Sequence, residues 1–222
     1  MTRGQTSGVP LPGAPCGLRE SRKRRTREAL LHAALRLFLT QGYDRTTVDE
    51  IVEAVEVSQR TFFRYFVNKE AVALAAQEAV DARFLAELRQ RPASETPFEA
   101  MRQAVLHAWS TLPESGGTDM TPELRVRAYR MIESTPALRA AHTRRTVGLE
   151  QQTTALIAER EGIDPEADPR ARVAVAAFSG VMRMTGQVWG GRKDAGIDAL
   201  RELTELHLDQ LGPALSGSRR VA

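Results

Sequence analysis

The apolar residues of this chain recur at helical spacing from about residue 19 to residue 211. An apolar stripe between Leu30 and Phe38 occupies positions i, i+3, i+4, i+7 and i+8, which places it on one face of a helix. Gly42 follows the stripe and predicts the C-terminal end of this first helix. No two segments show the alternation of paired strands, so the pattern predicts an all-α fold.

Cap residues divide the following stretch into three helices. Thr47 and Glu50 form a capping box, in which the Thr47 hydroxyl accepts from the Glu50 amide and the Glu50 carboxylate reaches back. Ser58 opens a second short helix, which carries a run of aromatic residues up to Phe66. Asn68 then opens a longer helix that ends near residue 89.

Proline and glycine mark the boundaries of the later helices. The pattern predicts helices at about residues 97–112, 121–135, 137–161, 169–189 and 196–211. The whole chain therefore contains about nine helices.

The residues from Thr46 to Phe66 are arranged as a helix-turn-helix. Only the turn at Glu56 and Val57 separates the two short helices, and in such a motif the second helix enters the major groove of DNA. Phe62 lies on the same side as Phe66 and anchors that second helix. The outward positions carry groups suited to base edges and phosphates, at Gln59, Arg60, Thr61 and Arg64. An ordinary helical hairpin has the same spacing and is the alternative interpretation.

Charge distinguishes the two ends of the chain. Residues 1–70 hold 12 Lys and Arg against 8 Asp and Glu, whereas residues 71–222 hold 19 against 20. Six basic residues crowd into the nine positions from Arg19 to Arg27. Such a cluster attracts a polyanion such as DNA, although a solvated, flexible tail has the same composition.

The stretch from Thr26 to Val72 resembles the DNA-binding domain of the TetR/AcrR family of bacterial transcriptional regulators. The resemblance rests on Leu37-Phe38, Gly42-Tyr43, Thr46-Thr47-Val48, Ile51, Val57-Ser58, the run from Thr61 to Phe66, and Asn68-Lys69-Glu70. It implies a three-helix DNA-binding head at residues 19–70, preceded by a disordered tail at residues 1–18. The sequence departs from the family at Glu56, where glycine is common, and a positive φ at that position costs about 1 kcal/mol.

The resemblance also implies which residues meet double-stranded DNA. Thr46 and Thr47 are expected to hold the DNA backbone at the start of the second helix, and Tyr65 is expected to touch a phosphate, as is Lys69. Basic residues just before the first helix, Arg24 and Arg25 among them, are expected to reach the minor groove or the backbone. The residues expected to face the major groove are Gln59, Arg60, Thr61, Phe63 and Arg64.

The family joins such a head to a helical body, which is expected here at residues 71–211 and is followed by a flexible tail at residues 212–222. The body is expected to form a homodimer, because a two-fold symmetric operator requires a symmetric protein. The expected interface lies on the last two long helices and comprises Val181, Trp189, Ile197, Leu200, Leu203 and Leu206. A core within one chain is the alternative interpretation of these apolar stripes.

A looser similarity relates residues 122–161 to bodies that bind acyl-CoA-like ligands. It rests mainly on Arg125, Arg127, Arg144 and the motif from Ser134 to Leu138. An apolar cavity with one or two arginines at its mouth suits an acyl chain with an anionic head, so the expected effector is small, hydrophobic and acyl-CoA-like. The candidate lining residues are Met101, Trp109, Tyr129, Met131, Phe178, Met182 and Trp189, and plain core packing is the alternative for each.

The sequence does not indicate catalysis, a cofactor, a metal site or a membrane span. The four histidines are far apart, the acidic stretch from Asp164 to Asp168 lacks the glycine and glutamate of a calcium loop, and nucleotide-binding and hydrolase motifs are absent. No apolar run is long enough to cross a bilayer, and the single cysteine, Cys16, favours a cytoplasmic setting.

We therefore expect a non-enzymatic, sequence-specific transcriptional regulator that binds a palindromic operator as a homodimer. Repression that a small-molecule effector relieves is the expected mode, and an activator would use the same head. A helical protein that acts on a protein partner through its body, with DNA binding incidental, is the alternative from another class.

Overall fold

The computed structural model describes residues 16–111, 121–192 and 196–216, which form ten helices and no strand. The helices are α1 (Cys16–Gln41), α2 (Val48–Glu53), α3 (Gln59–Tyr65), α4 (Lys69–Gln90), α5 (Pro97–Thr111), α6 (Pro122–Ser134), α7 (Pro136–Glu161), α8 (Arg170–Gly191), α9 (Ile197–Asp209) and α10 (Leu211–Leu215). The expected all-α fold is confirmed. No described helix combines the length and the hydropathy that crossing a bilayer requires.

Both ends of the described chain are helical where the sequence suggested a tail. α1 already begins at Cys16, three residues before the expected start of the head at residue 19, and the expected tail at residues 1–15 lies outside the described residues. α10 occupies residues 211–215, and residues 217–222 also lie outside the described part of the chain. The short α10 accounts for ten helices where the spacing indicated about nine.

The three expected N-caps are present. Thr47 N–H donates to Glu50 Oε2 at 2.7 Å, and Glu50 N–H donates to Thr47 Oγ1 at 3.2 Å. The side chains of Ser58 and Asn68 accept from backbone amides three residues further on, at 3.2 and 2.7 Å. Because these bonds satisfy amides that have no partner within their helix, the caps define where α2, α3 and α4 begin.

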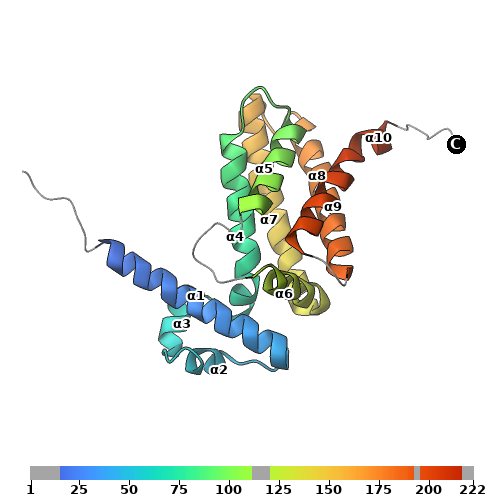
Figure 1. Ribbon diagram of the computed structural model, residues 1–222. Coiled ribbons are helices and arrows are strands. Elements are labelled where there is room, and N and C mark those ends of the chain that lie inside the picture. Colours follow the sequence, from blue (N-terminus) through green and yellow to red (C-terminus); the bar gives the residue numbers. More distant parts are fainter. Residues whose placement is uncertain (1–15, 112–120, 193–195, 217–222) are drawn as a thin grey trace, which may run out of the picture.

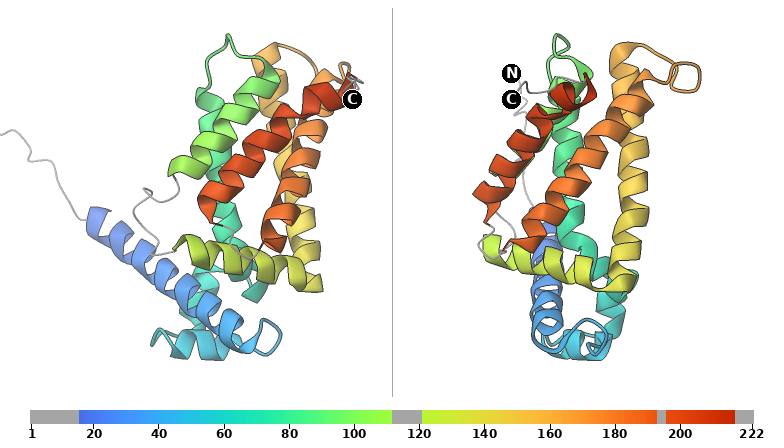
Figure 2. Two further views of the ribbon diagram at one scale, coloured as in Figure 1. Left: turned by 45° about the vertical axis from the view of Figure 1, so that its right-hand side comes forward. Right: turned by 90° about the vertical axis from the view of Figure 1, so that its right-hand side faces the viewer.

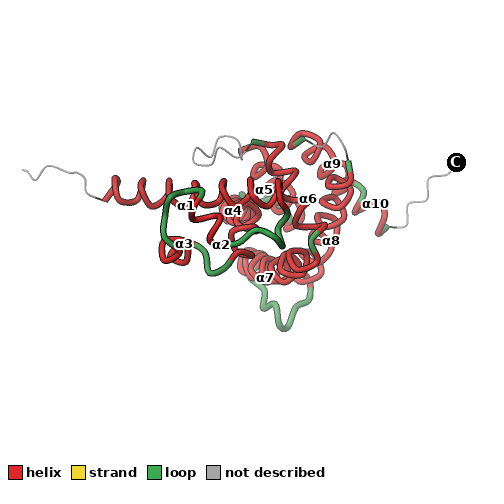
Figure 3. The backbone as a smooth tube through the Cα atoms, turned by 90° about the horizontal axis from the view of Figure 1, so that it is seen from below, coloured by secondary structure: helices red, strands yellow, loops and turns green. Residues whose placement is uncertain are grey.

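The helices form a small head and a larger upright body (Figure 1). α1, α2 and α3 make up the head, and α4 runs from the head along the length of the body. α6 lies across the lower ends of the upright helices, between them and the head (Figure 2). Seen from below, the N-terminal turns of α1 project past α2 and α3 on the side away from the body (Figure 3).

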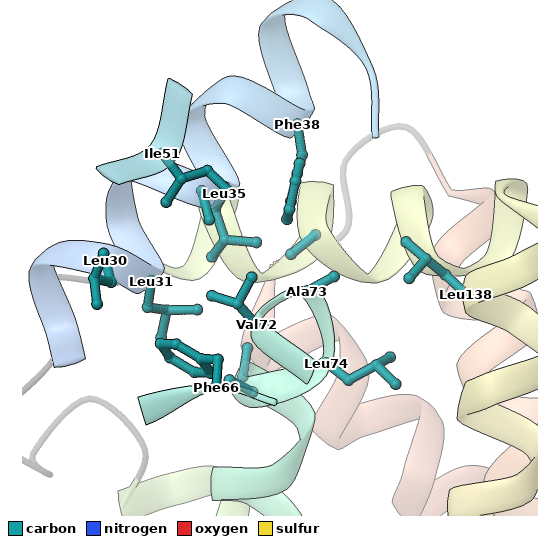
Figure 4. Close-up of a cluster of buried hydrophobic side chains, with 14 of the residues drawn as sticks. Leu30, Leu31, Leu35, Phe38, Ile51, Phe66, Val72, Ala73, Leu74 and Leu138 are labelled. Atoms are coloured by element: carbon teal, nitrogen blue, oxygen red, sulfur yellow. The ribbon is translucent and has the colours of Figure 1, made fainter. Parts of the chain in front are cut away.

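One cluster of buried side chains joins the head to the body. Phe38 of α1, Phe62 of α3 and Val72 of α4 belong to the same cluster as Ile132 of α6 and Leu138 of α7. Figure 4 shows how side chains of this cluster converge between α1, α4 and the start of α7. A second cluster fills the bundle of α4, α5, α7 and α8, and a third lies between α6, α8 and α9. The first turns of α4 therefore pack in the core of the head, past residue 70.

Candidate nucleic-acid interface and effector cavity

Hydrogen bonds within the α2–turn–α3 unit set its geometry. Val57 N–H donates to Val52 O at 3.0 Å and closes the turn, while Gln59 Nε2 donates to Asp49 Oδ1 and ties the start of α3 to α2. Glu56 in the turn has a φ of 56°, the left-handed conformation that favours glycine. The positive φ that the sequence raised as a possibility is thus confirmed, with a glutamate in that position.

α3 has a buried face and an exposed face. Phe62 and Phe66 are buried, and their ring centroids lie 5.7 Å apart. Phe63 points the other way and is 52% exposed in spite of its apolar ring. Thr61 is half-buried, and its hydroxyl lies 3.1 Å from Ser58 Oγ. The polar residues on the exposed face are Gln59, Arg60 and Arg64. This face carries most of the residues that we expected to face a groove.

Arg64 stacks on the neighbouring tyrosine at the C-terminal end of α3. Its guanidinium carbon lies 5.0 Å from the centroid of the Tyr65 ring, and Nη2 donates to the Tyr65 hydroxyl at 3.3 Å. Stacking of this kind restricts the rotamers of a long, exposed side chain. Arg64 is therefore held at the surface of α3.

Two of the expected DNA contacts have side chains that are engaged within the head. Thr46 is 1% exposed, and its hydroxyl donates to Gly42 O at 2.9 Å. Lys69 Nζ donates to Tyr43 O at 2.7 Å and to Thr46 O at 2.8 Å, and lies 4.3 Å from the Tyr43 ring centroid. Since an ammonium has three donors, Lys69 is largely committed to closing the loop between α1 and α2. Thr47, in contrast, is exposed.

The basic cluster at the N-terminus lies on α1. Arg24 and Arg25 are exposed, and Arg24 Nε lies 3.8 Å from a carboxylate one turn further on. Arg27 is directed at the rest of the head: its guanidinium carbon lies 5.0 Å from the Phe66 ring centroid, and Nη2 lies 4.0 Å from Glu78 Oε2. The cluster therefore offers exposed positive charge on a helix, while Arg27 connects α1, α3 and α4.

A cavity of about 450 Å³ lies in the body, bordered mainly by α4, α6, α7 and α8. This volume is within the range of small-molecule sites. Of the expected lining residues, the cavity is bordered by Trp109, Tyr129, Phe178, Met182 and Trp189. The expectation is wrong for Met101, which is buried in the core of the bundle, and for Met131, which packs in the cluster that joins head and body.

Ion pairs that the sequence did not suggest involve three residues of the cavity wall, Asp81, Glu133 and His142. Arg145 Nε donates to Asp81 Oδ2 at 2.9 Å, and Arg145 Nη1 donates to Glu78 Oε1 at 3.0 Å. His142 Nδ1 lies 3.1 Å from Glu133 Oε1. Burial raises the pKa of the Asp81 carboxyl, and Arg145 opposes that rise. No local motif reveals the pairs of Arg145, because they join residues 64 and 67 positions apart.

Tyr129 borders the cavity where two glycines of α8 leave room for its ring. A Cβ at Gly186 would overlap the Tyr129 hydroxyl, and one at Gly190 would lie 3.1 Å from the ring. The Tyr129 centroid lies 5.4 Å from that of Trp189 and 6.1 Å from that of His142. Burial raises the pKa of the Tyr129 hydroxyl, and Glu133 adds to the rise. The glycines therefore determine how closely Tyr129 approaches α8.

The residues expected at a dimer interface divide between core and surface. Trp189, Leu200 and Leu203 are buried in a cluster of this chain's own body, so the alternative of an intrachain core applies to these three and their expected role is wrong. Val181 and Ile197 are half-buried against the body. Of the six expected residues, Leu206 is the one that is exposed.

An exposed apolar face does occur on α8 and α9. Leu206 of α9 is 55% exposed, and Met184 and Val188 of α8 are exposed as well. Thr185 Oγ1 and His207 Nδ1 lie 2.9 Å apart, so the turns that carry Met184 and Leu206 are adjacent. Periodicity does not distinguish an outer apolar stripe from an inner one, so the sequence alone did not separate these exposed residues from the buried ones.

Comparison with known proteins agrees with this geometry. Residues 30–76 match a family model described as "Bacterial regulatory proteins, tetR family", and residues 95–216 match one described as "MftR C-terminal domain". The HTH-type transcriptional regulator TcmR of Streptomyces glaucescens is 43% identical over 204 residues, which cover 92% of this chain and 90% of TcmR.

Solved structures share the fold. A transcriptional regulator from Aquifex aeolicus has a TM-score of 0.54 at 17% identity, over 84% of this chain and 99% of that one. The fatty acid degradation regulator FadR of Bacillus halodurans has a TM-score of 0.54 at 19% identity, over 84% and 94%. With the family models matching head and body, and with a relative similar along nearly its full length, the chain belongs to the TetR family of bacterial helix-turn-helix transcriptional regulators.

Proposed function

We propose that the chain represses transcription as a homodimer and leaves its operator when a small hydrophobic effector enters the cavity of the body. The observation that carries the proposal is that the cavity and the head share buried residues. Ala76, Ala128 and Ile132 line the cavity and belong to the same packed cluster as Phe38 and Phe62 of the head. Because packed interiors are not freely deformable, a ligand that displaces α4 or α6 also displaces the helices of the head.

The proposed DNA interface is the exposed face of α3 together with the N-terminal turns of α1. Base edges and phosphates would be contacted by Gln59, Arg60 and Arg64 of that face, with the half-buried Thr61 beside them. The ring of Phe63 suits a thymine methyl group. Arg24 and Arg25 would contact the backbone or the minor groove, as would Thr47 and Tyr65 at the two ends of the motif.

The proposed dimer interface is the exposed apolar face formed by Met184, Val188 and Leu206. Two copies joined there would present two α3 helices to successive major grooves, which lie about 34 Å apart. An effector that favours another separation of the heads releases the dimer from its operator. A coupling free energy of about 1–3 kcal/mol is enough to change operator affinity markedly.

The effector is proposed to be small and mainly apolar. An acyl-CoA-like molecule is the class that the sequence suggests, and the aromatic side chains around the cavity suit the apolar part of such a ligand. We propose that the protein acts in the cytoplasm, where bacterial DNA lies, and without catalysis of its own. The support for this point is that TcmR, the relative with 43% identity, is a transcriptional regulator.

Fluorescence anisotropy against the DNA upstream of its own gene tests the proposal. Arg64→Ala should weaken specific binding by about 1–3 kcal/mol, because it removes a guanidinium from the DNA-facing side of α3. Arg89→Ala is the matched control, since Arg89 is exposed at the far end of α4, and it should leave affinity unchanged. Equal affinity for upstream and scrambled DNA at every salt concentration would refute specific binding. Transcription in vitro from the same fragment then distinguishes a repressor from an activator.

A further inference from the structure

Among the charged residues around the cavity, the carboxylates have partners within the protein and one arginine does not. Each carboxylate that lines it has a cationic or imidazole partner: Asp81 with Arg145 at 2.9 Å, Glu133 with His142 at 3.1 Å and Glu150 with Arg183 at 3.8 Å. Each of these carboxylates is therefore already engaged by another side chain of the protein. A cationic ligand would find no free carboxylate among the described lining residues.

Arg125 of α6 has no oppositely charged partner among the described residues. It lines the cavity and is half-buried, and its guanidinium makes no hydrogen bond or ion pair within the described part of the chain. Burial lowers the pKa of the guanidinium, and no nearby carboxylate opposes that effect. Arg139 also lines the cavity without an ion pair, but it is exposed, so water solvates it. Arg125 is therefore the partly desolvated cation of the cavity that lacks a counter-charge.

A second donor of the cavity wall is also without an acceptor. Trp109 Nε1 is buried and has no hydrogen-bond partner, and Trp109 lines the same cavity. The other indole of the wall differs, since Trp189 Nε1 donates to Gly196 O at 2.9 Å. Trp109 of α5 packs on the cluster that contains Val126 of α6, and its buried Nε1 becomes available to a ligand only when the indole turns. A buried N–H without an acceptor is uncommon in native proteins.

We propose that the effector is a compact apolar molecule bearing one ionised oxygen group, which Arg125 and Trp109 receive. This inference rests on the proposed function, since it assigns the chemistry of the effector for the same cavity. Both free groups are donors, and a guanidinium matches the two oxygens of a carboxylate or sulfonate. A neutral ligand would exclude water from Arg125 without supplying a counter-charge, which disfavours its binding.

Two fluorescent probes that differ only in charge test the inference on the full chain. Anilinonaphthalene sulfonate (ANS) carries the anion, and phenylnaphthylamine (NPN) has the same rings without it. Arg125→Met should weaken ANS binding about ten- to a hundredfold, the effect of a lost charge-assisted hydrogen bond, and should leave NPN binding within about twofold. Trp109→Phe should weaken ANS binding about three- to tenfold, because it removes one neutral donor.

Arg127→Met is the matched control. It removes the same charge from the same helix, but Arg127 is exposed and borders a different hollow, between α1 and α6. ANS affinity should be unchanged in this variant, which excludes a general effect of net charge. Unfolding curves of the variants confirm that each one retains its fold.

The inference is overturned if Arg125→Met binds ANS as tightly as the unmodified chain, or if the unmodified chain binds neither probe. Either result leaves the repressor proposal standing, because operator binding is measured without any probe. Displacement of bound ANS by naphthoate or by naphthyl phosphate supports the inference and identifies a carboxylate or a phosphate as the source of the anion. A failure of operator binding, with ANS binding intact, refutes only the proposed function.

Discussion

Replacing Glu56 by glycine should stabilise the protein, because the turn between α2 and α3 holds this glutamate in a left-handed conformation. A φ of 56° costs an L-residue about 1–2 kcal/mol, and glycine is free of that cost. Glycine also gives the unfolded chain more conformational freedom, which lowers the free energy of unfolding by about 0.4–1 kcal/mol. The Glu56 side chain is exposed and makes no hydrogen bond or ion pair with the described residues, so no contact is lost. The net gain should be about 1 kcal/mol.

Urea unfolding followed by circular dichroism measures this difference. Glu56→Ala is the matched control, because alanine removes the same charge and keeps the backbone strain. The glycine variant should gain about 1 kcal/mol in free energy of unfolding over the alanine variant, or about 2–4 °C in Tm for a chain of this size. Both variants remove a negative charge from beside the DNA-facing helix, so both should raise DNA affinity equally, and less so at high salt.

A glycine variant that is no more stable than the alanine variant would refute the reasoning. It would mean that the turn holds residue 56 without strain, so that the departure from the family's glycine has no energetic consequence. A gain shared by both variants would instead assign the effect to the charge of Glu56.

Three further predictions concern the head and the cavity. Gly186→Ala should destabilise the protein by about 1–3 kcal/mol and weaken ANS binding, because its methyl group overlaps the hydroxyl of Tyr129. Gly180→Ala is the control and should do neither, because the atom nearest to its methyl group is 3.9 Å away. Lys69→Met should cost about 1–3 kcal/mol in unfolding free energy, because two loop carbonyls lose their donor, and should leave the salt slope of DNA binding unchanged. The capping-box hydrogen bonds lower the pKa of Glu50 below its ordinary 4.5, so the stability that they contribute should be lost as the pH falls below about 4.5.

Each of these has its own refuting outcome. Equal stability of the Gly186 and Gly180 variants in thermal melts would show that Tyr129 moves aside freely. A salt slope that falls by about 0.9 in the Lys69 variant would restore Lys69 as a phosphate contact. For Glu50, the sign follows from its lowered pKa, since the folded chain then binds fewer protons than the unfolded chain. Glu50→Gln should therefore show a smaller loss of stability between pH 5 and pH 3, and an unchanged loss would contradict the assignment.

Much of the head was predictable because its determinants are local. The caps at Thr47, Ser58 and Asn68 bond to amides three residues away, so the residues that define α2, α3 and α4 are neighbours in sequence. The buried side of α3 follows from the spacing of Phe62 and Phe66 alone. The strain at Glu56 was accessible for the same reason, since a tight turn restricts φ whatever surrounds it.

The sequence by itself determined the all-α fold, the helix-turn-helix and the presence of a separate body, because helical periodicity and capping act over a few residues. Only the tertiary structure decided what lies against each face. Lys69 meets the loop carbonyls near Tyr43, and Arg145 meets Asp81 across the body. Trp189 packs into its own chain's core, which periodicity could not tell from an interface. The physical reason is that a side chain's spacing along a helix determines its direction, whereas its partner depends on which helix the fold brings opposite it.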